Sequence, residues 1–187
     1  MPIRNMILAG LFASMLAISS QVSLLLPLSP VPHTLQIMFI LLAGAVLGCR
    51  WGGTSAVVWV LLGVFGLPVF HQGKAGAVHL LGPTGGFLIG FILCAFLVGR
   101  LTERSDNTLV KTALIMYGGL AVVYLVGLVG FMASFAFFLH KPMTWGQATT
   151  LAVLPFLPYD IVKTFIAAYI GVRVKKALIR AGYIAGR

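Results

Sequence analysis

One carboxylate in this chain lies in an unusual place. The sequence of 187 residues holds only three acidic residues, and Glu103 and Asp106 stand together in a polar stretch. Asp160 instead lies inside a long apolar run and is followed three positions later by Lys163. Residues i and i+3 are neighbours on a helix surface, so the two side chains can pair. An ionisable pair at membrane depth is costly and usually faces a bundle interior or a pathway, so this pair is the first candidate for ligand contact.

The residues before Asp160 predict a break in its helix. Pro155 and Pro158 interrupt the apolar run, and a broken helix is tolerated at membrane depth only where it lines protein or a cavity. A helix that restarts at Pro158 or Tyr159 places Asp160 in its first turn, where the helix dipole favours a carboxylate. There Asp160 can accept from ligand N–H groups while Lys163 donates to a carbonyl or carboxylate. This chemistry suits a small, amide-like ligand; the alternative is an ion pair that only neutralises itself.

The composition predicts the environment in which this pair must be positioned. The chain is 60% hydrophobic and 9% charged, with a mean hydropathy of +1.06. Soluble domains carry about 25% charged residues, so the chain is predicted to be an integral membrane protein. At about 20 residues per span, it has room for five or six spans within a single transmembrane domain, residues 1–187, and no separate soluble domain. The net charge of +10 does not indicate nucleic-acid binding, because the basic residues flank apolar segments.

The apolar segments predict an all-α fold with six transmembrane helices. They cover residues 6–28, 35–48, 53–70, 86–99, 112–139 and 147–172, the last broken or restarted at Pro155 or Pro158. With six spans, ten of the thirteen basic residues fall on one side, which predicts that both termini are cytoplasmic in a cell (inner) membrane. These ten are Arg4, Arg50, Arg100, Arg104, Lys111, Arg173, Lys175, Lys176, Arg180 and Arg187.

The other polar and small residues give weaker signals. The connector of residues 29–36 is rich in proline and ends in Gln36. The connector of residues 70–87 is rich in glycine, which lets the backbone approach a ligand closely. The alternative is that the second connector only joins two helices. Ala9, Ala13 and Ala17 place a small residue at every fourth position, a spacing that lets helices approach closely. The four histidines lack metal-site spacing and are interpreted as polar loop residues, and the two cysteines as small hydrophobes: His33, His71, His79, His140, Cys49 and Cys94. No cofactor, metal or ATP site is predicted.

Four segments together resemble a known family. They read PVPHTLQ at residues 30–36, GLPVF at 66–70, LGPTGGF at 81–87 and PYDIVK at 158–163. In this order they are similar to the BioY family, the biotin-specific S components of energy-coupling factor (ECF) vitamin transporters. The resemblance covers nearly the whole chain. Two positions depart from it. Lys74 stands in a loop that tends to be glycine-rich in the family, with a polar uncharged residue possible in it, and Tyr159 stands where glycine is common.

The resemblance implies a compact six-helix protein that captures biotin from outside and has no catalysis of its own. It implies that Asp160 and Lys163 contact the vitamin, while the loop between spans three and four helps to close the pocket. It also implies that the face with Ala9, Ala13 and Ala17 docks on an ECF T component, alongside two cytoplasmic ATPase subunits. Some members work without a dedicated module, which leaves self-association as the alternative.

We hypothesise a role for each candidate residue in binding biotin. Asp160 accepts from the ureido N–H groups, Lys163 donates to the ureido oxygen, and Lys74 meets the carboxylate at the outer mouth. The other candidates, for ring packing and for the lining of the pocket, are Trp59, Phe70, Phe87, Gln36 and Gly85. Two other classes stay open: an intramembrane enzyme using Asp160 with a histidine, disfavoured because the spans hold no second acid or nucleophile, and a purely structural membrane subunit.

Overall fold

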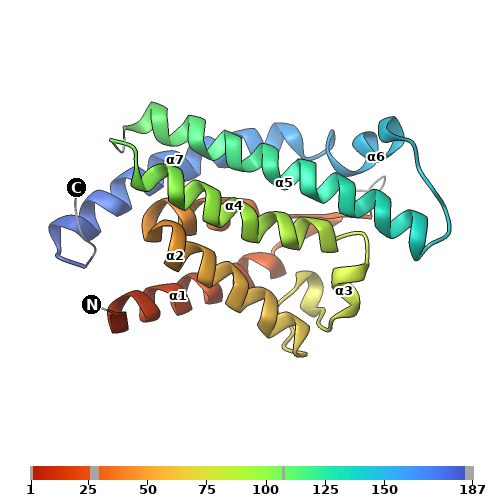
Figure 1. The fold of residues 1–187 in the computed structure, drawn as a ribbon, viewed down its shortest axis with the longest axis horizontal. Coiled ribbons are helices and arrows are strands. Elements are labelled where there is room, and N and C mark those ends of the chain that lie inside the picture. Colours follow the sequence, from red (N-terminus) through yellow and green to blue (C-terminus); the bar gives the residue numbers. More distant parts are fainter. Residues whose placement is uncertain (1, 26–29, 107, 184–187) are drawn as a thin grey trace.

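The computed structural model describes residues 2–25, 30–106 and 108–183 and consists almost entirely of helices (Figure 1). In chain order the elements are α1 (Pro2–Gln21), β1 (Ser23–Leu25), β2 (Pro32–Thr34), α2 (Gln36–Val64), the 3₁₀ turn η1 (His71–Gly73), α3 (Val78–Leu81), α4 (Gly85–Glu103), α5 (Leu109–Phe137), α6 (Trp145–Ala152) and α7 (Leu157–Arg180).

The helices confirm the prediction of a membrane protein. Within the described residues four helices, α1, α2, α4 and α5, are long and apolar enough to cross a membrane. The pair α6 and α7 passes the same test as a fifth, with a bend of 55° at the break between them. Residues 153–156 form that break, so the predicted interruption near Pro155 and Pro158 is confirmed.

The first connector differs from the all-α prediction. The helix expected over residues 6–28 ends at Gln21, and β1 then pairs with β2 as a two-stranded antiparallel ribbon. Leu24 stands opposite His33 in this ribbon. A strand ladder satisfies backbone groups that the helix would otherwise bond, and proline is tolerated at the first residue of such a strand, where Pro32 stands. Pro27 and Leu28, predicted to end the first span, lie outside the described residues.

The long helix α2 reverses direction at Gly48. Gly48 has φ 80° and ψ −176°, which is open to glycine and strained for other residues. A Cβ placed on Gly52 would lie 2.5 Å from the carbonyl oxygen of Ala43, nine residues earlier. An unbroken helix separates such residues by about 13 Å along its axis, so the two halves of α2 must fold back on each other. Glu103 stabilises the reversal, because its Oε1 accepts from the backbone N–H of Cys49, 2.8 Å away, at the start of the second half.

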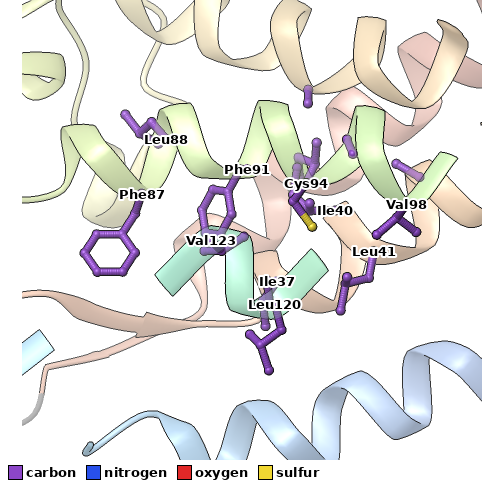
Figure 2. Packing of buried hydrophobic residues seen from close by; sticks show 14 of the residues in the cluster. Ile37, Ile40, Leu41, Phe87, Leu88, Phe91, Cys94, Val98, Leu120 and Val123 are labelled. Carbon is purple, nitrogen blue, oxygen red and sulfur yellow. The ribbon is translucent and has the colours of Figure 1, made fainter. Parts of the chain in front are cut away.

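Buried apolar side chains from α2, α4 and α5 meet in the centre of the molecule (Figure 2). Cys94 is among them and is fully buried, and the neighbouring side chains include Ile40 and Leu41 from α2 and Leu120 from α5. The middle of α5 therefore shares one core with α4 and the first half of α2.

The two ends of the described chain lie at the same end of the molecule (Figure 1). Arg4 donates from Nη1 to the carbonyl oxygen of Gly182, 2.5 Å away, and stands over the ring of Tyr183. The loop with η1 and α3, together with α6, lies at the opposite end of the molecule.

Candidate functional site

A cavity opens among the residues at this opposite end. It has a volume of about 690 Å³ including its open mouth. Small-molecule sites are typically apolar clefts with a few polar groups. The lining is largely apolar, and its polar groups come from β2, α2, α5, α7, the N-cap of α4 and the loop of η1 and α3. The lining residues are Val31, Pro32, His33, Thr34, Gln36, Ile37, Phe70, His71, His79, Thr84, Phe87, Leu88, Phe91, Val123, Tyr124, Ala152, Phe156 and Asp160.

Asp160 reaches this cavity because of the broken helix. Pro158 occupies one of the first two positions of α7, where its missing N–H costs nothing. The backbone N–H of Asp160 donates to the carbonyl oxygen of Phe156, 2.9 Å away. Asp160 is the acidic residue of the first turn of α7, as predicted. The positive end of the helix dipole therefore favours its charge.

The Asp160 carboxylate belongs to a hydrogen-bonded network of three side chains. Lys163 Nζ lies 2.7 Å from Asp160 Oδ1, and the hydroxyl of Tyr124 donates to Oδ2 at 2.6 Å. Lys163 also donates to the carbonyl oxygen of Thr34, 2.7 Å away. Asp160 and Lys163 are only 8% and 9% exposed, so the predicted pair is present and shielded from solvent.

The network retains capacity for a ligand. A carboxylate offers about four lone-pair sites and an ammonium group three donors. Within the described residues Asp160 uses two of its sites, and Lys163 uses two of its donors. The unused groups of Asp160 can accept N–H donors, and the remaining donor of Lys163 can serve an oxygen.

The structure brings several of the other predicted residues to the same cavity. Gln36, Phe70 and Phe87 line it together with Asp160. Gln36 Oε1 accepts from the hydroxyl of Thr34 at 2.8 Å, which ties the start of α2 to the ribbon strand that Lys163 contacts. Four segments distant in sequence therefore meet in one site.

Four predicted residues lie outside the lining. Lys163 is one of them, but it bonds two residues of the lining, Asp160 and Thr34. Trp59 is fully buried behind Phe70, with the two rings edge to face at 5.7 Å, and thus supports the wall. Gly85 also stands behind the lining, because a Cβ there would collide with the carbonyl oxygen of Leu80; this close approach lets α3 pack against the start of α4. Lys74 is an exposed loop residue beside the cavity.

Four residues with polar rings line the cavity and were not predicted as site residues from the sequence. Tyr124 belongs to α5, and its phenol lies seven residues after that of Tyr117, whose hydroxyl also bonds α7, at the carbonyl oxygen of Ile161. Two polar-tipped rings seven residues apart on one apolar span were the available signal. The other three are histidines that had been interpreted as loop residues: His33, His71 and His79.

The histidines give the cavity an uncharged polar lining. The ring of His33 stacks on Phe156, with centroids 5.6 Å apart. Burial, and to a smaller extent the charge of Lys74, lowers the pKa of His71 to about 4. Burial also lowers the pKa values of His33 and His79, so these rings favour the neutral form. His140 is an exposed residue outside the lining.

The alanine stripe of α1 packs largely within the chain. Ala9 is 5% and Ala13 3% exposed, and Ala17 is partly buried against the core. The neighbouring Gly10 and Ser14 are exposed, so they are the accessible part of this small-residue face. Docking of this face on a partner stays a prediction.

Metal chemistry has no support in the described residues. No group of three or more His, Cys, Asp or Glu side chains gathers there in a way that could hold a metal ion. The polar groups of the cavity are arranged for hydrogen bonding.

Comparison with known proteins identifies the family. A family model described as the BioY family matches residues 1–180. The chain belongs to the BioY family. Proteins similar to this BioY family member include a biotin transporter BioY of Thermotoga maritima, 39% identical over 92% of this chain and 96% of the relative, and a probable biotin transporter BioY of Pyrococcus horikoshii, 36% identical over 94% and 98%.

A solved structure supports the same relationship. The crystal structure of an S-component for biotin from an ECF-type ABC transporter matches with a TM-score of 0.83 and 26% identity. The match covers 94% of this BioY family member and 92% of the solved chain. The likeness therefore extends over the helices that build the cavity.

Proposed function

We propose that this BioY family member captures biotin from the outer side of the membrane, as the S component of an ECF-type transporter. The observation that carries the proposal is the network of Asp160, Lys163 and Tyr124, in which Asp160 and Tyr124 line a largely apolar cavity and Lys163 is bonded to Asp160. The relatives are named biotin transporters, and the similar solved structure is an S-component for biotin.

The chemistry of biotin fits the polar groups of the cavity. Biotin presents two ureido N–H donors, which match the unused lone pairs of Asp160, and one ureido oxygen, which matches the remaining donor of Lys163. Tyr124 holds the carboxylate in one orientation. The thioether ring packs against the aromatic wall that includes Phe70 and Phe87, since sulfur–aromatic contacts are favourable.

The carboxylate of biotin has its complement at the mouth of the cavity. Lys74 is exposed in the adjoining loop, and its charge acts on the rings of His71 and His79 in the lining. Lys74 can therefore meet a carboxylate that projects outward, while the neutral histidines supply hydrogen bonds.

Six membrane crossings are the topology that we propose. The two halves of α2 count as separate crossings because the chain reverses at Gly48. With α1, α4, α5 and the broken pair α6 and α7 this makes six, in one domain. An even number agrees with the contact between Arg4 and Gly182 near the two chain ends. The excess of basic residues at that end favours cytoplasmic termini in the cell (inner) membrane.

The proposed partners follow from the function of an S component. An ECF T component and two cytoplasmic ATPase subunits would supply the energy for release, and the exposed small residues of α1, Gly10 and Ser14, extend the face that docks. Self-association is the alternative for a member without such a module. The names of the relatives favour transport over an intramembrane enzyme or a structural subunit.

Calorimetric titration of the detergent-purified chain with biotin tests the proposal. We expect tight binding by the unmodified chain and weaker binding by Asp160→Asn, by about 2–5 kcal/mol, because removal of one partner leaves a buried charge unpaired. The matched control is Asp106→Asn, since Asp106 pairs with Lys111 in an exposed connector and should not affect binding. Equal affinities of Asp160→Asn and the unmodified chain would refute the role of Asp160.

A further inference from the structure

The last residue of α1 is bonded to the loop that forms one wall of the cavity. The side-chain amide of Gln21 donates from Nε2 to the carbonyl oxygens of Phe70, at 3.0 Å, and Pro68, at 3.2 Å. Its Oε1 accepts from the backbone N–H of Gly73 at 2.8 Å. A single side chain therefore bonds the backbone on both sides of the turn at residues 71 and 72.

The turn that Gln21 spans is a strained one. Gln72 has φ 56° and ψ 33°, the left-handed region that non-glycine residues rarely adopt, and Gly73 follows with φ 69°. Such a conformation persists only where the surroundings over-determine it. Phe70 donates its own N–H to the carbonyl oxygen of Lys74, which closes the turn, and Gln21 supplies the bonds from outside.

The turn matters because it supplies lining residues. Phe70 and His71 both face the cavity, and Phe70 is only 2% exposed. The carbonyl oxygen of Val69 accepts from both Ser20 Oγ, at 2.7 Å, and Trp59 Nε1, at 3.0 Å. The end of α1 thus contacts three consecutive residues of the wall.

We propose that Gln21 is a positioning residue that latches the Phe70 wall of the biotin cavity to α1. This inference rests on the proposed function, in which the wall must hold biotin and later release it. Gln21 is exposed, so water competes for its bonds and each contributes only modestly to the closed state. Several weak hydrogen bonds suit a wall that must open to release its ligand. Because these bonds join the wall to α1, a displacement of α1 would also move the wall.

The test measures the wall with and without ligand. In Gln21→Leu, which has a similar size and no amide, we expect biotin to dissociate about tenfold faster, as the loss of two or three neutral hydrogen bonds implies. Without biotin, amide hydrogen exchange in residues 67–76 should accelerate, above all at Gly73. The control Thr54→Val also makes a solvent-accessible, partly buried helical side chain apolar, but the Thr54 hydroxyl bonds only the carbonyl oxygen of Arg50 in its own helix, so both rates should stay unchanged.

A second variant separates the bonds from the packing. Gln21→Glu keeps an acceptor for Gly73 but sets a carboxylate against two carbonyl oxygens, so it too should release biotin faster. Unchanged dissociation or unchanged loop exchange in both Gln21 variants would overturn the latch. Absence of biotin binding by the unmodified chain would refute the proposed function instead, while the exchange measurement would still decide whether Gln21 holds the loop.

Discussion

Lys163→Met is the most informative single change at the site. The substitution keeps the length of the side chain but removes an ammonium group that lies 2.7 Å from Asp160 and 2.7 Å from the carbonyl oxygen of Thr34. Both members of the pair are less than a tenth exposed. Removal of one partner of a buried pair typically costs about 3–5 kcal/mol, because the remaining charge loses its compensation. We therefore expect a clear loss of thermal stability in detergent together with a loss of biotin binding.

The double variant Asp160→Asn, Lys163→Met separates stability from recognition. It leaves no uncompensated charge, so its stability should recover most of the loss, since replacement of a whole buried pair is often neutral. Biotin binding should stay impaired, because the charged acceptor and the ammonium donor for the ureido group are both gone. Lys111→Met is the control, as its partner Asp106 is exposed.

Two results would refute this reasoning about the ion pair. If Lys163→Met unfolds at the same temperature as the unmodified chain, the stability of the fold does not depend on the compensation of the Asp160 charge by Lys163. If the double variant binds biotin as the unmodified chain does, the pair serves the fold and not recognition. Thermal unfolding and calorimetric titration on the same four preparations decide between these cases.

Three further changes test the surroundings of the pair. Tyr124→Phe removes a hydrogen bond to a charged acceptor and should lower the free energy of unfolding by about 1.5–3 kcal/mol. Tyr117→Phe removes a hydrogen bond to a backbone carbonyl and should lower it by only about 0.5–1.5 kcal/mol. Denaturant titration measures both changes. Gly63→Ala places a methyl group against the phenyl ring of the cavity wall and should weaken biotin binding in calorimetry, whereas Gly10→Ala has open space and should not. Because the pKa of His71 is lowered to about 4 in the folded chain, its imidazole stays neutral there between pH 6.5 and 4. In the unfolded chain the same imidazole takes up a proton below its ordinary pKa of 6.5. Stability should therefore fall as the pH drops from 6.5 to 4, and His71→Gln should reduce this slope in melting curves; an unchanged slope would contradict the burial of the ring.

Local spacing carried the part of the site that the sequence could predict. Asp160 and Lys163 are three residues apart on one helix, and the prolines before them mark where that helix begins, so their pairing follows from helix geometry. Tyr124 is 36 residues away on another helix. Its contact depends on how α5 packs on α7, which no local pattern contains.

Aromatic and small residues illustrate the same limit. Trp59 and Phe70 have similar apolar surroundings in the sequence, yet Phe70 lines the cavity and Trp59 supports it from behind. Which of the two rings lines the cavity depends on how the helix and the loop that carry them pack in three dimensions. Likewise the spacing of the alanines in α1 predicted a close helix contact. In the structure Ala9 and Ala13 are buried within the chain itself. Spacing indicates that a face packs closely but not which helix it meets.

Glu103 has a consequence for the charge balance of the whole molecule. Its carboxylate is occupied by the backbone of Cys49, Asp106 is paired with Lys111, and Asp160 with Lys163. All three Asp and Glu side chains are therefore bonded within the molecule, while the formal net charge stays at +10. Electroneutrality at the arginine-rich end must come from outside, from lipid phosphates or a neighbour's acidic groups. The purified protein therefore needs anionic lipids or other anions bound at that surface.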